Sequence, residues 1–238
     1  MQNKSNLFRN HCFMIFFIKC NYYIFVKIIP LAQMKLINLS HIIDNNTQVH
    51  PYDAPMSLQQ DKFLHSDKFN NYRLEMGMHT GTHIDTPMHL TDNKKFINEY
   101  DLNQFCGAAT VIDVRNEDLI KYNPQFDEMV SENDIVLLYT GHDKNYDKKE
   151  YFTHHPVLDM SLAEFLISKK VKMLGFDLPS PDQYPFQIHQ KLFAADILIL
   201  ENLQNLDTVL NKKIKIYAFP LNIKADASIV NVVAEILS

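Results

Sequence analysis

Residues 79–89 read HTGTHIDTPMH, so three histidines and one aspartate fall within eleven consecutive positions. Packing alone does not explain such a density of side chains that can bind a metal ion. His79, His83 and Asp85 have the same parity, and alternate residues of an extended chain point to one face. We therefore expect a strand that aims two imidazoles and a carboxylate at one point.

A helix over the same residues is disfavoured. At about 3.6 residues per turn, it would keep His79 beside His83 but turn Asp85 away from both. Gly81 and the β-branched residues around it also have low helix propensity. A proline removes a donor from a sheet, so Pro87 should end the strand and leave His89 in the loop that follows.

Chance clustering is the alternative, because the chain has 11 histidines to distribute. The zinc-protease motif HExxH is excluded, since Thr80 follows His79 where that motif needs its general-base glutamate. Three cysteines without a CxxC pair indicate neither a disulfide framework nor a thiolate zinc site. The expected ligands are therefore nitrogen and oxygen atoms, which suit Zn²⁺ or Mn²⁺.

Size and charge narrow the class of protein. A chain of 238 residues with 46% hydrophobic and 21% charged residues is ordinary for a globular protein with one domain or two. The formal net charge is −5 and no basic run occurs, so nucleic acid is not an expected partner.

Residues 12–32 are more apolar than the rest of the chain. The stretch is long enough to cross a bilayer, but Lys19, Asn21 and Lys27 interrupt it, and each buried lysine costs about 2.5–3.5 kcal/mol. A signal peptide with a poor cleavage site, a genuine structural segment, and a mis-assigned start before Met34 are the other interpretations.

We therefore divide the chain into an N-terminal hydrophobic extension, residues 1–33, and a body, residues 34–238. No membrane contact is expected for the body. The protein is expected to be cytoplasmic, or exported or membrane-anchored if residues 1–33 are genuine.

The body reads as one α/β layered domain with a mixed sheet and flanking helices, because apolar β-branched runs alternate with helical patterns late in the chain. We expect strands near 35–39, 72–78, 108–114, 134–140, 171–176, 196–200 and 213–220. The capping box Ser161-x-x-Glu164 predicts a helix over about 160–170, and further helices are expected over 186–195 and 203–210. A short helix or strand should follow Ser228.

A metal site needs more ligands than residues 79–89 supply, and two candidates lie later in the chain. His189 falls on the expected helix over 186–195. Glu201 ends the apolar strand over 196–200, and side chains at strand ends often lie at the mouth of a site. From the residues alone, an exposed helix face for His189 and a solvated strand end for Glu201 stay open.

The pattern HxGTHxDxPxH over 79–89 resembles the signature of the cyclase family of metal-dependent hydrolases, which includes bacterial kynurenine formamidase. Six further segments are similar to segments of that family, and together they extend the resemblance over about residues 35–230. They are NLSHI (38–42), VHPYDAP (49–55), YTGHD (139–143), YFTHHP (151–156), GFDLPSPD (175–182) and the stretch from His189 to Leu203.

The resemblance implies a swivelling β/β/α, cyclase-like fold and a metal site, commonly dinuclear. Its implied ligands are His79, His83, Asp85, His189 and Glu201. They would hold one or two Zn²⁺ ions, or Mn²⁺. The implied assembly is a homodimer or homotetramer.

The implied reaction is hydrolysis of an amide C–N bond in a small-molecule substrate by a metal-bound hydroxide. His89, just beyond the ligand strand, would relay the proton to the departing nitrogen. The expected activity is that of an arylformamidase acting on N-formylkynurenine, in tryptophan catabolism. A cyclic amide, imide or lactone is the alternative substrate, and a non-catalytic metal-binding module is the alternative class.

The chain departs from the family pattern at three places. Thr86 stands where alanine is usual, and His142 replaces a frequent tryptophan, which would alter the substrate pocket. Residues 224–231 lack the usual glycine, proline and arginine residues, which puts the contacts of that loop in doubt. Substrate-binding residues are unknown, and the aromatic residues that could flank a ring are Tyr52, Phe69 and Tyr72.

Overall fold

The structure, a computed structural model, describes residues 34–237, and the expectations for residues 1–33 lie outside the described residues. Within that part of the chain, no helix has the length and apolar character needed to cross a bilayer.

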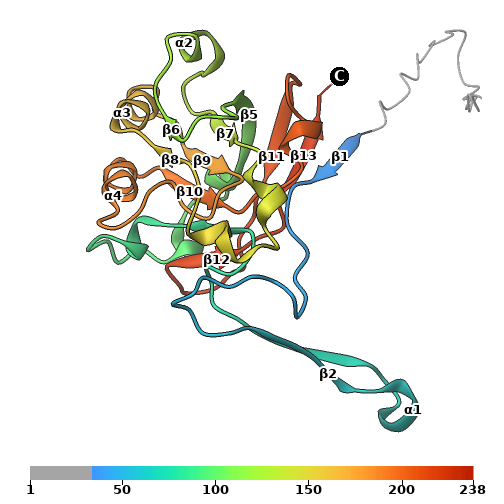
Figure 1. The fold of residues 1–238 in the computed structure, drawn as a ribbon. Helices are drawn as coiled ribbons and strands as arrows, with labels where there is room; N and C mark the ends of the chain where they lie inside the picture. Colours follow the sequence, from blue (N-terminus) through green and yellow to red (C-terminus); the bar gives the residue numbers. More distant parts are fainter. Residues whose placement is uncertain (1–33, 238) are drawn as a thin grey trace, which may run out of the picture. The chain divides into compact units, whose positions relative to one another are not determined.

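The body is built on a nine-stranded mixed sheet that curls around one of its faces (Figure 1). Its four central strands, β5, β7, β9 and β10, run parallel to one another, whereas every other pairing is antiparallel. The mixed sheet expected from the sequence is thus confirmed. In spatial order the strands are β1 (Lys35–Asn38), β13 (Val233–Ile236), β11 (Ile214–Tyr217), β5 (Cys106–Asp113), β7 (Ile135–Tyr139), β9 (Met173–Phe176), β10 (Leu198–Glu201), β4 (His83–Asp85) and β12 (Ala227–Ile229).

Parallel strands need long crossover connections, and each crossover here contains a helix. The helices are α2 (Phe126–Met129) between β5 and β7, α3 (Met160–Ser168) between β7 and β9, and α4 (Gln187–Phe193) between β9 and β10. A small parallel pair, β6 (Leu119–Ile120) and β8 (Val157–Leu158), lies beside them. Short 3-10 helices span Pro87–His89, Ile97–Glu99, Leu102–Phe105, His142–Asn145, Lys149–Phe152 and Leu206–Thr208.

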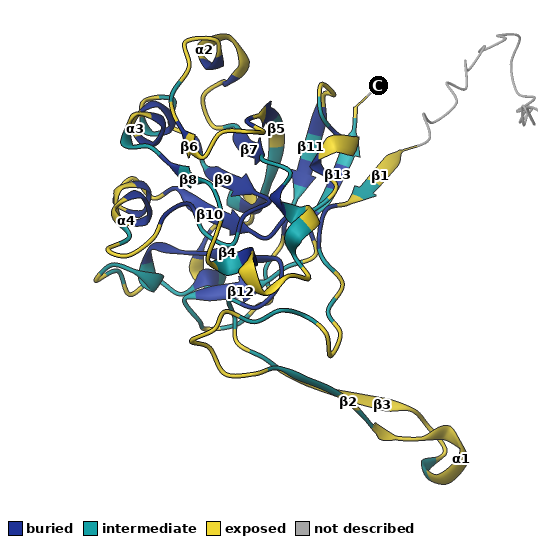
Figure 2. Cartoon of the chain, in the orientation of Figure 1, coloured by how far each residue is buried: buried dark blue, intermediate teal, exposed yellow. Residues whose placement is uncertain are grey.

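Successive side chains of the central strands point to opposite faces of the sheet, and each face contributes to a separate apolar core. In β7, Ile135 and Leu137 join the core inside the curl, and Val136 and Leu138 join the core beneath α3 and α4. All four side chains are fully buried (Figure 2). Burial of each such side chain stabilises the fold by about 1.5–3 kcal/mol. This packing holds the central strands, and therefore the residues at their ends, in fixed positions.

The predicted helix over 160–170 is present, but its cap differs from the prediction. Asp159 is the N-cap residue and its side chain accepts a hydrogen bond from Ser161 N at 3.0 Å. The helix therefore begins at Met160, before the predicted capping serine. The aspartate takes the cap because it stands one position outside the helical backbone, where its carboxylate reaches the free N–H groups.

Two other expectations were wrong. Residues 203–210 form only the 3-10 turn Leu206–Thr208, which follows Asn205 in the left-handed conformation (φ 60°). The strand expected over 79–85 is limited to His83–Asp85, because Gly81 takes a left-handed conformation (φ 73°) and bends the chain just before it. Glycine tolerates that conformation without steric cost.

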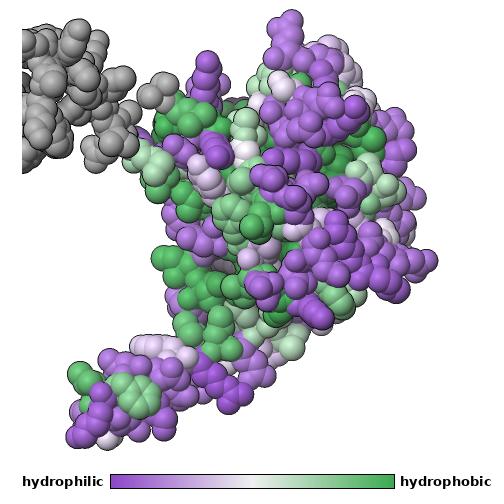
Figure 3. Space-filling model, turned by 180° about the vertical axis from the view of Figure 1, so that it is seen from behind, coloured by the Kyte–Doolittle hydropathy of each residue, from purple (hydrophilic) through white to green (hydrophobic). Residues whose placement is uncertain are grey.

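The strand expected over 72–78 pairs outside the main sheet. β3 (Asn71–Glu75) and the unpredicted β2 (Ser57–Lys62) form a two-stranded ribbon, with the single-turn helix α1 (Leu64–Asp67) at its tip (Figure 1). Figure 3 shows hydrophobic residues at the tip and on the body near the base of the ribbon. Apolar side chains that stay exposed on the ribbon and its tip are Phe63, Leu64, Phe69, Tyr72 and Leu74.

Gly175, in the middle of β9, is required by close packing. A Cβ atom there would lie 2.6 Å from Leu137 Cδ2 and 3.1 Å from Leu203 Cδ1. We therefore expect Gly175→Ala to lower the free energy of unfolding by about 1–3 kcal/mol through overpacking.

Urea denaturation at an unchanged m-value measures this loss. Gly77→Ala is the control, because a Cβ atom there would meet only Thr80 Oγ1 at 3.5 Å, and its effect should stay within about 0.5 kcal/mol. Equal stabilities for the Gly175 variant and the original protein would show that the neighbouring leucines move aside freely.

Candidate functional site

The candidate site lies where the end of β10 meets the start of β4. These strands are antiparallel, with Glu201 directly opposite His83 and Ile199 opposite Asp85. Directly opposed residues share a face of the sheet, so the side chains of His83 and Glu201 lie close together. His83 Nε2 lies 3.4 Å from Glu201 Oε2 and 3.3 Å from Asp85 Oδ1.

His79 reaches the same point from outside the strand. Its backbone lies in the turn before β4, which is a correction to the expectation of one continuous extended segment. Its ring nevertheless points inward, with Nδ1 2.9 Å from Asp85 Oδ1. The turn at Gly81 thus brings His79 beside His83, at 5.2 Å between ring centroids.

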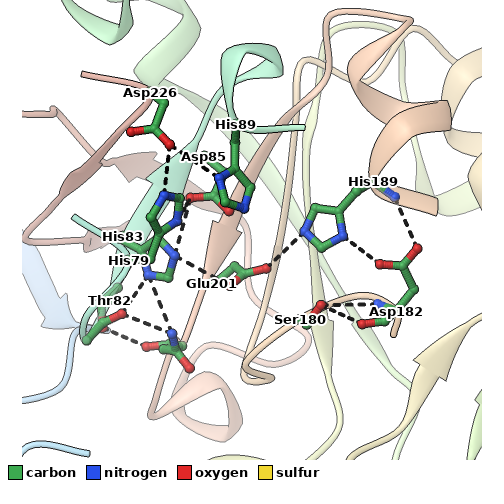
Figure 4. Close-up of polar contacts among 12 residues, drawn as sticks. His79, Thr82, His83, Asp85, His89, Ser180, Asp182, His189, Glu201 and Asp226 are labelled. Carbon is green, nitrogen blue, oxygen red and sulfur yellow. Dashed lines mark hydrogen bonds and ion pairs between the residues drawn. The ribbon is translucent and has the colours of Figure 1, made fainter. Parts of the chain in front are cut away.

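His189 enters from the opposite side, on the first turn of α4. Its Nε2 atom lies 3.5 Å from Glu201 Oε1. Two overlapping groups of side chains, His79/His83/Asp85 and Asp85/His189/Glu201, each place one potential ligand atom per residue within 4.8 Å of the others. All five predicted ligands therefore lie together (Figure 4), and Asp85 belongs to both groups.

Each of the three imidazoles has an acceptor at its outer nitrogen. His79 Nε2 contacts Asp226 Oδ2 at 3.0 Å, His83 Nδ1 contacts the Gly81 carbonyl oxygen at 2.8 Å, and His189 Nδ1 contacts Asp182 Oδ1 at 2.5 Å. An imidazole that binds a metal ion commonly donates its other N–H to such an acceptor, which fixes its orientation.

The site is buried and rich in negative charge. Burial raises the pKa of Asp85, but the neighbouring His79 and His83 outweigh it and hold that pKa well below its usual value. Burial lowers the pKa of His79 and of His189, whereas the adjacent carboxylates outweigh it and raise these values to about 11 and about 9. The carboxylates therefore draw positive charge into the site.

The donor set fits a divalent cation. His83 Nε2, Asp85 Oδ1 and Glu201 Oε1 are buried, face one another, and make no hydrogen bond. Buried polar atoms are normally satisfied, and no lysine or arginine among the described residues pairs with Asp85 or Glu201. Imidazole nitrogens and carboxylate oxygens are the ligands that Zn²⁺ and Mn²⁺ accept.

A cavity of about 470 Å³ opens above these groups. His79, Asp85, His189 and Glu201 form part of its lining, as does His89, which lies in the 3-10 turn Pro87–His89. No lysine or arginine lines it among the described residues. The aromatic part of the wall consists of His50, Tyr52, Phe152, His155, Tyr184 and Phe186. A smaller hollow of about 140 Å³ lies on the ribbon, and its lining shares no residue with this cavity.

Of the aromatic residues considered from the sequence, Tyr52 lines the cavity, whereas Phe69 and Tyr72 lie on the ribbon and its tip. The expectation that His142 alters the pocket stays a prediction, because His142 itself is not among the residues that line the cavity. His142 is buried against the Tyr151 ring, 4.8 Å between centroids, and its Nε2 contacts the Tyr151 carbonyl oxygen at 2.9 Å.

Two carboxylates escaped the sequence reasoning. Asp182, in the loop before α4, contacts His189 and also accepts from the backbone of Ile188 at 2.6 Å. Asp226 contacts both His79 and His89. The available signal was that Asp226 keeps the aspartate of the family's usual run over 224–231, although the glycine, proline and arginine residues of that run are missing.

The chain resembles known proteins along most of its length. A family model described as "Putative cyclase" matches residues 37–183. The kynurenine formamidase of Bacillus cereus (strain ATCC 14579) is 32% identical over 203 residues, which are 83% of this chain and 95% of that protein. The kynurenine formamidase of Bacillus anthracis is 31% identical over 205 residues, 84% of this chain and 96% of that protein.

Solved structures share the fold. Isatin hydrolase A from Ralstonia solanacearum superposes with a TM-score of 0.77 at 21% identity, over 86% of this chain and 92% of that one. A structure described as a predicted metal-dependent hydrolase from Bacillus stearothermophilus gives 0.72 at 23% identity, over 86% of this chain and 99% of that one. The cyclase-like fold implied by the sequence resemblance is thereby confirmed.

Asp85→Asn and Glu201→Gln test whether these carboxylates hold an ion. Each change keeps the side-chain volume but removes a negative charge and a ligand oxygen, so we expect each variant to bind less metal than the original protein. Elemental analysis after dialysis measures the metal per chain. Glu164→Gln, an exposed change on α3, is the control, and full metal content in both site variants would remove these carboxylates from the ligand set.

Proposed function

The chain belongs to the cyclase family, and from that premise we propose that it is a metal-dependent hydrolase that cleaves the amide C–N bond of an N-formyl aromatic amine. The observation that carries the proposal is the largely buried cluster of three imidazoles and two carboxylates on the wall of an aromatic cavity. The kynurenine formamidases that match almost the whole body support the formyl group as the part removed.

We propose His79, His83, Asp85, His189 and Glu201 as the ligands of one or two Zn²⁺ ions, or of Mn²⁺. A divalent cation bound there supplies a water of lowered pKa and polarises a carbonyl oxygen. The ligands come from a turn, two strands and a helix, so the ion position is set by packed elements and not by one flexible loop.

His89 is proposed to move the proton. The nitrogen that departs from the amide is a poor leaving group until it is protonated, and a positioned imidazole contributes typically 10²–10⁴-fold to such a step. His89 lines the cavity beside His79, with 4.1 Å between ring centroids. Its side chain is therefore close to the ligand group without belonging to the five proposed ligands.

The aromatic wall is proposed to hold the ring of the substrate. Tyr52 and Tyr184 are highly exposed at the cavity, and aromatic faces stack on a flat ring with offset or edge-to-face geometry. A substrate with a large anionic group has no lysine or arginine partner in the described lining.

A cyclic amide such as isatin is the second candidate substrate, and the isatin hydrolase folds that superpose on this chain favour it. The chemistry at the carbonyl is the same, but the products differ, since ring opening releases no formate.

A cytoplasmic location and a homodimer or homotetramer stay predictions. The exposed apolar side chains of the ribbon support self-association, which the mass in solution tests.

Activity against N-formylkynurenine tests the proposed function. We expect Zn²⁺- or Mn²⁺-loaded protein to release formate, a chelator to abolish the release, and added metal to restore it. Isatin and a lactone complete the substrate panel. Metal-loaded protein that turns over none of these compounds would indicate a binding module, and turnover of isatin alone would favour the cyclic substrate.

His89→Ala tests the proton relay. The variant should keep its metal, because His89 is outside the proposed ligand set, and should lose about 10²–10⁴-fold in kcat. His65→Ala, at the exposed tip of the ribbon, is the matched control. Unchanged kcat in the His89 variant would assign the proton transfer to another group.

A further inference from the structure

One carboxylate at the site belongs to none of the five proposed ligands. Asp226 Oδ2 lies 3.0 Å from His79 Nε2 and 3.2 Å from His89 Nδ1. A single oxygen atom thus contacts an imidazole of the ligand group and the imidazole proposed as the proton relay (Figure 4).

The backbone holds Asp226 in place from two sides. The Asp226 carbonyl accepts hydrogen bonds from Thr86 N at 3.1 Å and from Thr86 Oγ1 at 2.7 Å, and the Ala225 carbonyl accepts one from Ile97 N at 2.9 Å. The next residue, Ala227, begins β12 and pairs with β4. Asp226 is therefore fixed relative to β4 by contacts that do not involve its own side chain.

The chemistry of the partners decides which ring nitrogens carry hydrogen. A carboxylate only accepts hydrogen bonds, and a neutral imidazole has one N–H and one nitrogen lone pair. In the neutral form, which is the form that binds a metal ion, each ring that donates to Asp226 keeps its lone pair on the other nitrogen, Nδ1 of His79 and Nε2 of His89. His79 Nδ1 faces Asp85 at 2.9 Å, where a ligand atom is needed.

We propose that Asp226 is a positioning residue that sets the tautomer and orientation of His79 and His89 together. The effect on His89 rests on the relay role in the proposed function. The effect on His79 rests only on the ligand group. An outer carboxylate of this kind typically contributes 10–100-fold to metal affinity or activity, and an aspartate that holds an imidazole in one tautomer is a recurring device in hydrolases.

An ion held directly by His79, His89 and Asp226 is the competing arrangement, since their ligand atoms are close enough. His79 would then have to bind ions through both ring nitrogens, because its Nδ1 already faces Asp85. A neutral imidazole has only one lone pair to offer. The hydrogen-bonded arrangement is therefore favoured, and the number of ions per chain distinguishes the two.

Asp226→Asn tests the proposal with little change in volume, and Asp92→Asn, at an exposed position outside the cavity, makes the same charge change as a control. In Zn²⁺-loaded protein we expect Asp226→Asn to lower Zn²⁺ affinity about 10–100-fold, measured by chelator competition. We expect a kcat loss of similar size with KM nearly unchanged. In a His89→Ala background the additional kcat loss should shrink to about twofold, because Asp226 acts through His89.

Nitrogen-15 NMR of the imidazoles in the Zn²⁺-loaded protein adds a readout that needs neither a variant nor a substrate. Neutral His89 should carry its proton on Nδ1. The proposal is overturned if Asp226→Asn keeps the Zn²⁺ affinity and kcat of the original protein, or if it causes the same loss of kcat in the His89→Ala background as in the original protein. A neutral His89 that carries its proton on Nε2 would also overturn it. Loss of one ion per chain in Asp226→Asn at saturating Zn²⁺ would favour the directly held ion instead. If the protein hydrolyses no substrate, the proposed function fails, yet affinity and NMR still test Asp226.

Discussion

The antiparallel pairing of β4 with β10 places His83 against Glu201, and the rest of the site is arranged around that pair. Asp85 lies two residues further along β4 on the same face. On the other edge of β4, β12 carries the Asp226 loop. On the other edge of β10, β9 leads into the loop and helix that bear Asp182 and His189. A slip of β4 by one residue would turn His83 and Asp85 to the opposite face, so the sheet register also sets the geometry of the proposed ligands.

That arrangement places charged groups where a fold normally excludes them. His83 and Asp85 are 1% exposed and Glu201 is 5% exposed, beside the fully buried Ile84 and Leu200. Buried charges are tolerated when they are paired and hydrogen-bonded. The carboxylates raise the pKa values of His79 and His189, and a divalent cation bound there would offset the same negative charges. The acceptors at the outer ring nitrogens, which are Asp226, the Gly81 carbonyl oxygen and Asp182, orient the three imidazoles whether protons or a cation occupy the site.

The sequence predicted those parts of the molecule that local patterns determine. Apolar β-branched runs located the central strands, and the capping-box pattern located α3 although Asp159 is its true cap. Parity placed His83 and Asp85 on one face because both lie within β4. His79 escaped that argument, since the turn at Gly81 positions it by tertiary packing. Asp226 escaped as well, because its contacts join segments 137 and 147 positions apart, which no local pattern records. His189 and Glu201 were candidates from their positions on an expected helix and at a strand end, and the family resemblance implied them as ligands.

The residues that would recognise a substrate come from different segments than the ligands. Tyr52 precedes the ribbon, Phe152 lies in the 3-10 turn after β7, and Tyr184 and Phe186 lie between β9 and α4. Such connections vary more freely than the strands they join. The aromatic wall can therefore change without disturbing the β4–β10 pair, which explains in physical terms how one fold could serve both formamide and cyclic amide substrates. Asp226 is different, because its loop continues directly into β12, which pairs with β4.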